Sequence, residues 1–262
     1  MKITFFGTAD GVPRKGHFCT STMIEISERV YLIDAGAPVA ELMLNHDKHP
    51  DQLAAFFNTH VHSDHIVGLL PLITLCGWAF TETRFGLYIP EQRLADAFAA
   101  FRSALVAPPK DAPPKDAPPP KGAAPKGTAS DRVAFHVYEA GEIYDDGFLK
   151  VTAYPTRHCW PRPSYALMLE AEGKRVFFSG DLSYGLGDYP TVVNEVETDL
   201  FVCEMAHFTG DEIASRLDDC KTKKLIFHHY QANKPPQIEA LATSGRFGFP
   251  ILRADDGDCV EV

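Results

Sequence analysis

The hydrophobic positions of the chain fall into short apolar runs that alternate with segments of helical spacing. Short apolar runs that end in glycine or polar turn residues are typical of strands, and apolar residues three and four positions apart are typical of helices. In the first half of the chain, the pattern predicts strands at 3–7, 21–27, 30–34, 53–58 and 86–89. It predicts helices at 38–49, 66–80 and 91–106.

The second half of the chain repeats this alternation. The predicted strands are 133–138, 149–154, 165–170, 176–179, 200–203 and 224–227, and the predicted helices are 209–217 and 236–244. Strand-rich halves with interspersed helices indicate two packed sheets covered by helices, a layered α/β or α+β class. The length of 262 residues is enough for one large core, and we expect a single domain over 1–262.

Residues 107–130 interrupt this alternation. They repeat Ala-Pro-Pro-Lys-Asp and are rich in proline, alanine, lysine and glycine. Such a segment has no apolar face to bury and its prolines lack amide donors, so it predicts an exposed, extended insert of polyproline-II type. A partner-binding segment or a flap over an active site is the alternative.

Charge and cysteine content narrow the class of protein. The formal net charge of −10 repels phosphate backbones, which disfavours a dedicated nucleic-acid binder without excluding a nuclease. No apolar run is long enough to span a bilayer, and the start of the chain lacks the pattern of a signal peptide. The six cysteines have no regular spacing, so we expect reduced thiols and a cytoplasmic location.

Three histidines and a carboxylate gather in the sequence His60-x-His62-x-Asp64-His65, between an apolar strand and an apolar helix. Imidazole nitrogens and carboxylate oxygens suit zinc and similar divalent ions. Alternate residues of an extended segment point to the same side, so His60 and His62 can share one metal. The chain then turns, which lets Asp64 and His65 address a second metal. The strand–loop–helix context favours this interpretation over ordinary polar residues.

Further candidate ligands follow strands in the second half. His158 comes after the strand at 149–154, Asp181 after the strand at 176–179, and His229 after the apolar end of the strand at 224–227. Their common position fits one rim of a sheet, where loops carry function.

Other histidines are weaker candidates. His228 competes with His229 for the last ligand position. His207, at the end of another strand, is predicted to bind substrate, to protonate a leaving group or to have only a structural role. The remaining histidines do not stand at the end of a predicted strand and are interpreted as background. They are His17, His46, His49 and His136.

On these residues the chain resembles the metallo-β-lactamase superfamily, and within it the ribonuclease Z-like and small phosphodiesterase-like bacterial branch. The motifs occur in the family's order: Gly7-Thr8 with Pro13, the Ser21 region, Leu32-Ile33-Asp34-Ala35-Gly36, the 60–65 motif, His158, Ser179-Gly180-Asp181 and His229. The resemblance covers nearly the whole chain apart from the insert. It implies an αββα sandwich, in which two mixed sheets face each other, helices lie outside and metals bind at one edge.

The resemblance also implies a ligand set. Metal one would take His60, His62 and His158, and metal two would take Asp64, His65 and His229. Asp181 would bridge the two metals, and Asp34 would orient their ligands, although a simple turn carboxylate is the alternative for Asp34. We expect two divalent ions, zinc by the nature of the ligands, with manganese or iron also fitting. Such a site activates water for attack on a carbonyl carbon or a phosphorus, and Asp64 would orient that nucleophile.

The resemblance favours a hydrolase of phosphodiester bonds, acting on a small phosphodiester, a cyclic nucleotide or RNA. Processing of transfer RNA is disfavoured, because the short segment 159–180 leaves no room for the inserted RNA-gripping arm of the bacterial enzymes. The Gly-His-Ser-Thr segment of those enzymes has no clear match either. A small-molecule or phosphodiester substrate is therefore expected, with no membrane partner, and a homodimer is compatible with the sequence.

Three alternatives on the same fold remain. A thioesterase or lactonase of the glyoxalase II type shares the first motif. A di-iron redox protein typically has glutamate where this chain has His62 and is coupled to a flavin domain, and neither feature is present. A binding module without activity often loses ligands, whereas the set here is complete.

Overall fold

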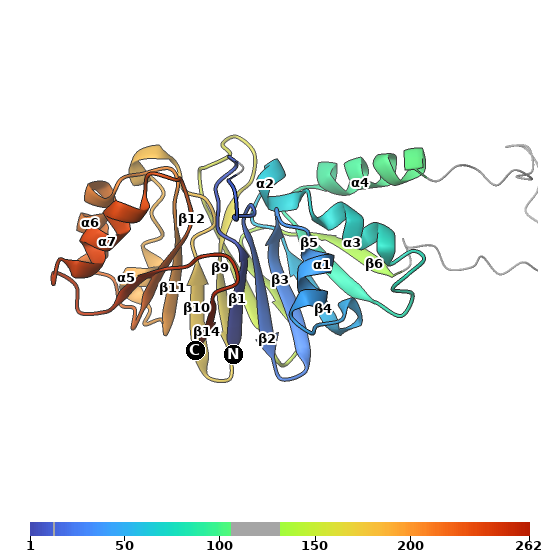
Figure 1. Cartoon of the computed structure of the whole chain (residues 1–262), viewed down its shortest axis with the longest axis horizontal. Helices are drawn as coiled ribbons and strands as arrows, with labels where there is room; N and C mark the ends of the chain where they lie inside the picture. The colour runs from blue at the N-terminus through green and yellow to red at the C-terminus, as the bar shows by residue number, and fades with distance from the viewer. Residues whose placement is uncertain (13, 106–131) are drawn as a thin grey trace, which may run out of the picture.

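Two seven-stranded sheets face each other in a computed structural model of the protein, with helices on both outer surfaces (Figure 1). The structure describes residues 1–12, 14–105 and 132–262. The insert expected at 107–130 and Pro13 of the family motif lie outside these residues. The arrangement is the αββα sandwich that the resemblance implies, and this prediction is confirmed.

The first sheet contains the strands of the amino-terminal half and one carboxy-terminal strand, in the order β14-β1-β2-β3-β4-β5-β6. Its strands are β1 (Lys2–Gly7), β2 (Ser21–Ile26), β3 (Arg29–Ala35), β4 (Leu53–Phe57), β5 (Phe85–Ile89), β6 (Val133–Val137) and β14 (Cys259–Glu261). The pairs from β14 to β3 are antiparallel, and those from β3 to β6 are parallel.

The second sheet has the order β13-β12-β11-β10-β9-β8-β7. Its strands are β7 (Gly141–Asp145), β8 (Lys150–Pro155), β9 (Tyr165–Ala171), β10 (Lys174–Phe178), β11 (Leu200–Met205), β12 (Leu225–Tyr230) and β13 (Ile251–Arg253). The pairs from β7 to β10 are antiparallel, and those from β10 to β13 are parallel.

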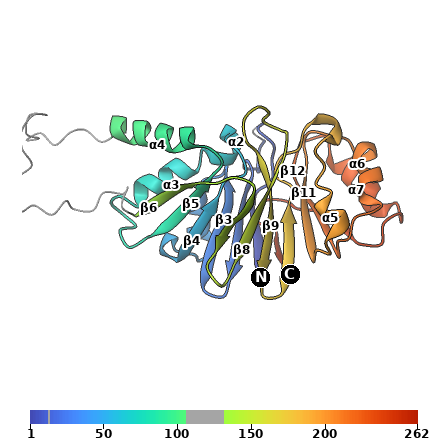
Figure 2. The same ribbon diagram turned by 180° about the vertical axis from the view of Figure 1, so that it is seen from behind.

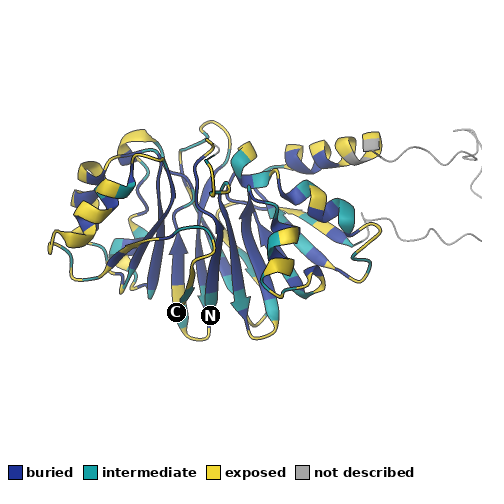
Figure 3. Ribbon diagram, in the orientation of Figure 1, coloured by how far each residue is buried: buried dark blue, intermediate teal, exposed yellow. Residues whose placement is uncertain are grey.

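The apolar residues form three layers of core. The inner faces of both sheets share one cluster, which includes Phe57, Leu167 and Val202. The outer face of the first sheet packs against α1 (Val39–Asn45), α3 (Leu69–Leu75) and α4 (Gln92–Leu105). The outer face of the second sheet packs against α5 (Val192–Glu195), α6 (Gly210–Leu217) and α7 (Pro235–Thr243). Central strands are buried on both faces (Figure 3), and each large apolar side chain fully buried there contributes about 1.5–3 kcal/mol.

The helix expected at 66–80 is wrong in its bounds, because two shorter helices replace it. α2 (Ser63–Ile66) is separated from α3 by Val67 and Gly68. A Cβ on Gly68 would lie 1.7 Å from the carbonyl oxygen of Ala37, so only glycine permits this close approach. The amide of Gly68 also donates to the carbonyl of Ala35 at 2.7 Å. Packing against the first sheet therefore ends one helix and begins the next.

Strand direction brings several strand ends to one edge of the sandwich. β4, β8, β10, β11 and β12 all end at the edge that carries α2, at the top of Figure 1, and both termini lie at the opposite edge. Figure 2 shows the same two edges of the sandwich from behind.

None of the described helices is long and apolar enough to cross a membrane. All six cysteines, which lie among the described residues, are unpaired in this structure.

Candidate metal centre

All seven side chains expected as ligands lie together at this edge. Their ligand atoms form overlapping groups whose members lie within 4.8 Å of one another. The groups are His60, His62, His158 and Cys159; His60, His65 and Asp181; Asp64, His65 and His229; and His158, Asp181 and His207. Cys159, which the sequence did not indicate as a ligand, joins the first group because its Sγ lies 3.8 Å from Nε2 of His62.

One half of the cluster consists of three imidazoles. Nδ1 of His62 lies 3.1 Å from Nε2 of His60 and 3.1 Å from Nε2 of His158. Nitrogens bound at 2.0–2.1 Å to a tetrahedral ion lie roughly 3.4 Å apart, so the three rings fit one zinc ion. Burial lowers the pKa of each of these imidazoles, which favours the neutral form that binds metals. His158 also donates from Nδ1 to the carbonyl of Leu182 at 3.2 Å, which leaves Nε2 free to bind.

Asp34 holds the loop that carries the motif. Its buried carboxylate accepts hydrogen bonds from the side-chain amide of Asn58 at 2.9 Å and from the backbone and hydroxyl of Thr59 at 2.8 and 2.7 Å. It also accepts from Nδ1 of His65 at 2.7 Å. Because Nδ1 is engaged there, Nε2 of His65 points into the cluster, where it is buried without a hydrogen-bond partner. Asp34 thus joins the loop at Asn58 and Thr59 to the ring of His65.

The other half of the cluster brings Asp64 and His65 beside His229. Oδ2 of Asp64 lies 3.6 Å from Nε2 of His65. Gly36 allows the motif to pack this closely, since a Cβ there would lie 1.8 Å from the carbonyl oxygen of Asp64. The glycine of the 32–36 segment is thus required by the position of the ligand loop.

Asp181 lies between the two halves. Its Oδ2 is 3.1 Å from Nε2 of His229, 3.7 Å from His60 and 3.6 Å from His158. Its Oδ1 is 3.4 Å from Nε2 of His65. Burial opposes ionisation, but the charges of His229 and His65 hold the pKa of Asp181 well below its usual range. An ionised carboxylate in contact with both halves fits a bridging ligand.

A β-bulge in β12 determines the directions in which the side chains of His228 and His229 point. The register between β11 and β12 pairs Glu204 with His228 and Met205 with Tyr230, so His229 is the extra residue, and its φ is +44°. The bulge turns His229 toward Asp181. His228 lies between the sheets instead, where its ring is 5.9 Å from that of Phe5, and burial lowers its pKa to about 3.

His207 reaches the cluster with the help of a carboxylate that sequence reasoning missed. Glu204 is fully buried and accepts from Nδ1 of His207 at 2.8 Å. It also accepts from the backbone amides of Leu182 at 2.8 Å and Ala206 at 2.7 Å. Burial opposes the charged form of His207, but the hydrogen bond and charge of Glu204 raise its pKa. The spacing Glu204-x-x-His207 after a strand is the signal that could have revealed this pair.

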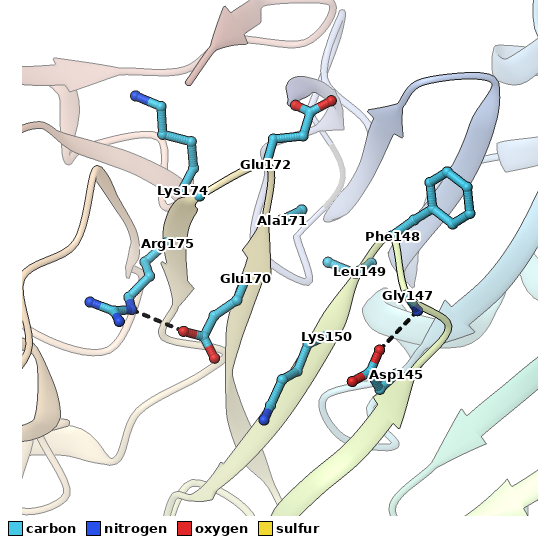
Figure 4. A pocket seen from close by; sticks show the side chains of 11 residues that line it. Asp145, Gly147, Phe148, Leu149, Lys150, Glu170, Ala171, Glu172, Lys174 and Arg175 are labelled. Carbon is cyan, nitrogen blue, oxygen red and sulfur yellow. Dashed lines mark hydrogen bonds and ion pairs between the residues drawn. The ribbon is translucent and has the colours of Figure 1, made fainter.

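The four histidines predicted to be background lie away from the cluster. His17 lies near Asp256, His46 near Phe6, His49 caps the short helix at Pro50–Gln52, and His136 stacks on Tyr88. A pocket at the opposite edge, shown in Figure 4, lies between two hairpin turns. Its charged side chains are largely paired, such as Arg175 with Glu170 at 2.9 Å, and we assign it no chemistry.

Comparisons with known proteins place this geometry in a family. The ribonuclease Z of Thermosynechococcus vestitus is 28% identical over 177 residues, which cover 67% of this chain and 38% of that protein. The chain thus spans well under half the length of this relative. The metallo-β-lactamase fold protein YhfI of Bacillus subtilis superposes with a TM-score of 0.75 at 16% identity, over 99% of both chains. A diphosphatase of the PhnP family superposes with a TM-score of 0.71 at 18% identity, over 100% of this chain and 97% of that one.

The predicted resemblance to ribonuclease Z-like members of the metallo-β-lactamase superfamily is therefore confirmed. A family model described as "Anti-Pycsar protein Apyc1" matches residues 1–249, which is nearly the whole chain. The protein belongs to this family, the anti-Pycsar protein Apyc1 family.

Proposed function

We propose that the protein is a hydrolase of phosphodiester bonds that depends on two divalent metal ions. The observation that carries the proposal is the position of Asp181, whose carboxylate oxygens approach imidazoles of both halves of the cluster. The names of a sequence relative, ribonuclease Z, and of a structural neighbour, a diphosphatase, support phosphate chemistry.

The residues divide into two sets of ligands. His60, His62 and His158 would hold one ion, Asp64, His65 and His229 would hold the other, and Asp181 would contact both. Zinc suits this mixture of imidazole and carboxylate, and manganese or iron would also fit. When bound, the two ions supply Lewis acidity, which lowers the pKa of water and stabilises charge on phosphate oxygens. Asp64 would orient the water, and His207 would donate a proton to the leaving oxygen.

A small phosphodiester, such as a cyclic nucleotide, is the proposed substrate class. The segment between His158 and Asp181 is filled by a short loop and the hairpin of β9 and β10, with no inserted arm to hold a folded RNA. The net charge of −10 also opposes binding of a long phosphate backbone.

Protein reconstituted with zinc or manganese is expected to hydrolyse bis-p-nitrophenyl phosphate, and to lose this activity when a chelator removes the metal. Parallel assays with a thioester and a lactone test the competing hydrolase classes. His136→Ala serves as a control, because His136 lies on β6 away from the cluster. Faster turnover of the thioester or the lactone, or no metal-dependent turnover at all, would contradict the proposal.

His207→Ala is expected to affect substrates according to their leaving group. Proton donation matters little for p-nitrophenolate, which leaves readily as an anion, but it matters greatly for an alkoxide. We expect a loss of about 10²–10⁴-fold in turnover of a cyclic nucleotide, and a much smaller loss with bis-p-nitrophenyl phosphate. Glu204→Gln keeps an acceptor for His207 but removes the charge. Its turnover of the cyclic nucleotide should lie between that of His207→Ala and that of the wild type. Equal losses on both substrates would show that His207 acts only structurally.

A further inference from the structure

Two large aromatic side chains are exposed on the loops that carry candidate ligands. Trp160 is 76% exposed and follows His158 by two residues, and Tyr184 is 78% exposed and follows Asp181 by three. Apolar surface rimmed by polar residues marks a binding site when several apolar groups share it, so the question is whether these two residues belong to one surface. Neither aromatic ring has a part in the metal cluster described above.

The two loops are joined to each other. The carboxylate of Asp188 accepts from the backbone amide of Arg157 at 2.5 Å on one loop, and from the amide and hydroxyl of Ser183 at 2.9 and 2.7 Å on the other. Nδ1 of His158 also donates to the carbonyl of Leu182. Trp160 and Tyr184 are therefore carried by one hydrogen-bonded unit, and their backbone positions are fixed relative to the ligands.

Both aromatic residues lie next to groups that line the centre. The ring of Tyr184 meets the ring of His207 edge to face, with centroids 5.2 Å apart and planes at 90°. His207 in turn lies 4.5 Å, between ring centroids, from the ligand His158. Trp160 is bonded to Cys159, whose Sγ lies 3.8 Å from Nε2 of His62. A molecule with its phosphate at the metals would therefore extend over the two loops that carry Trp160 and Tyr184.

We propose that Trp160 and Tyr184 form a stacking subsite for a flat aromatic heterocycle of the substrate. This inference rests on the proposed function, because it places the phosphodiester at the metals. Aromatic side chains bind nucleobases through their faces and tolerate different bases, since every base has a π-face. The subsite makes phosphodiesters that carry a base better substrates than those that carry only a sugar.

The first test compares a substrate with a base and one without. For adenosine 3′,5′-cyclic monophosphate, Trp160→Ala and Tyr184→Ala should each lower kcat/KM by about 5- to 150-fold, mainly through KM. For the 3′,5′-cyclic phosphate of methyl riboside, which has no base, the loss should be clearly smaller. Trp78→Ala is the matched control, because Trp78 is also 71% exposed but follows the far end of α3. Equal losses on both substrates, or no loss on either, would overturn the subsite.

The second test measures binding without turnover. The chain has two tryptophans, so Trp78→Phe leaves Trp160 as the sole fluorophore. Titration of this metal-loaded variant with a phosphorothioate analogue of adenosine 3′,5′-cyclic monophosphate should quench its fluorescence to saturation. Trp160→Phe, which reports only Trp78, should stay unquenched. Quenching without turnover of any phosphodiester would overturn the proposed function and leave the subsite standing. Turnover without quenching would overturn the subsite alone, and the absence of both would overturn both proposals.

Discussion

Replacing Asp181 with alanine is expected to abolish phosphodiesterase activity, with a fall in turnover of about 10³-fold or more. The carboxylate lies within 3.1–3.7 Å of four imidazoles that belong to both halves of the cluster. Its removal would leave two bound cations without the negative charge between them, so they would repel each other. Stabilisation by metal ions amounts to several kcal/mol in such reactions, and each 1.36 kcal/mol is worth a factor of ten in rate.

Elemental analysis checks the same variant without reference to activity. Wild-type protein purified without chelator should hold about two divalent ions per chain, and Asp181→Ala should hold about one or fewer. Asp181→Asn keeps the size of the side chain and removes its charge, so it separates the electrostatic effect from the cavity that alanine leaves. Thermal unfolding of both variants controls for loss of the fold. An Asp181→Ala protein that kept both metals and full turnover would refute the two-metal mechanism.

The strands that carry the site could be predicted from sequence because they are buried on both faces. β10, β11 and β12 appear as nearly continuous apolar runs, as strands in the parallel part of a sheet do when helices cover one face and a second sheet the other. β7 lies at the edge of its sheet and is mostly exposed, so its sequence lacks an apolar face to reveal it. β13 and β14 are too short to show a period.

The motif at 60–65 could be predicted because its residues are close in sequence and follow one strand. The role of Glu204 could not, because what distinguishes it is complete burial and hydrogen bonds to a loop far from it in sequence. The strand pattern alone also left His228 and His229 open, and only the resemblance to the family favoured His229. Adjacent strand residues face opposite sides, and only the bulge in the pairing with β11 determines which histidine reaches Asp181.

Alanine at His229 and alanine at His228 are expected to have different effects, although the residues are neighbours. His229→Ala removes an imidazole 3.1 Å from Asp181, so the second metal should bind at least about 100-fold more weakly and turnover should fall with it. His228→Ala removes a buried ring that packs near Phe5 and Phe178, between the sheets. It should leave both metals in place and lower stability by about 2–4 kcal/mol, as expected for a cavity in a core.

Two measurements distinguish these outcomes. Metal stoichiometry after dialysis against a weak chelator should fall for His229→Ala and stay near two for His228→Ala. The melting temperature of the metal-free proteins should fall more for His228→Ala, by about 2–4 °C for each kcal/mol of lost stability. His228 has no hydrogen-bond partner at Nδ1, so its effect on stability comes from packing, and His228→Leu should recover part of the loss. If His228→Ala lost the metal and His229→Ala kept it, the last ligand would be His228, and the bulge in β12 would not place the ligand as we infer.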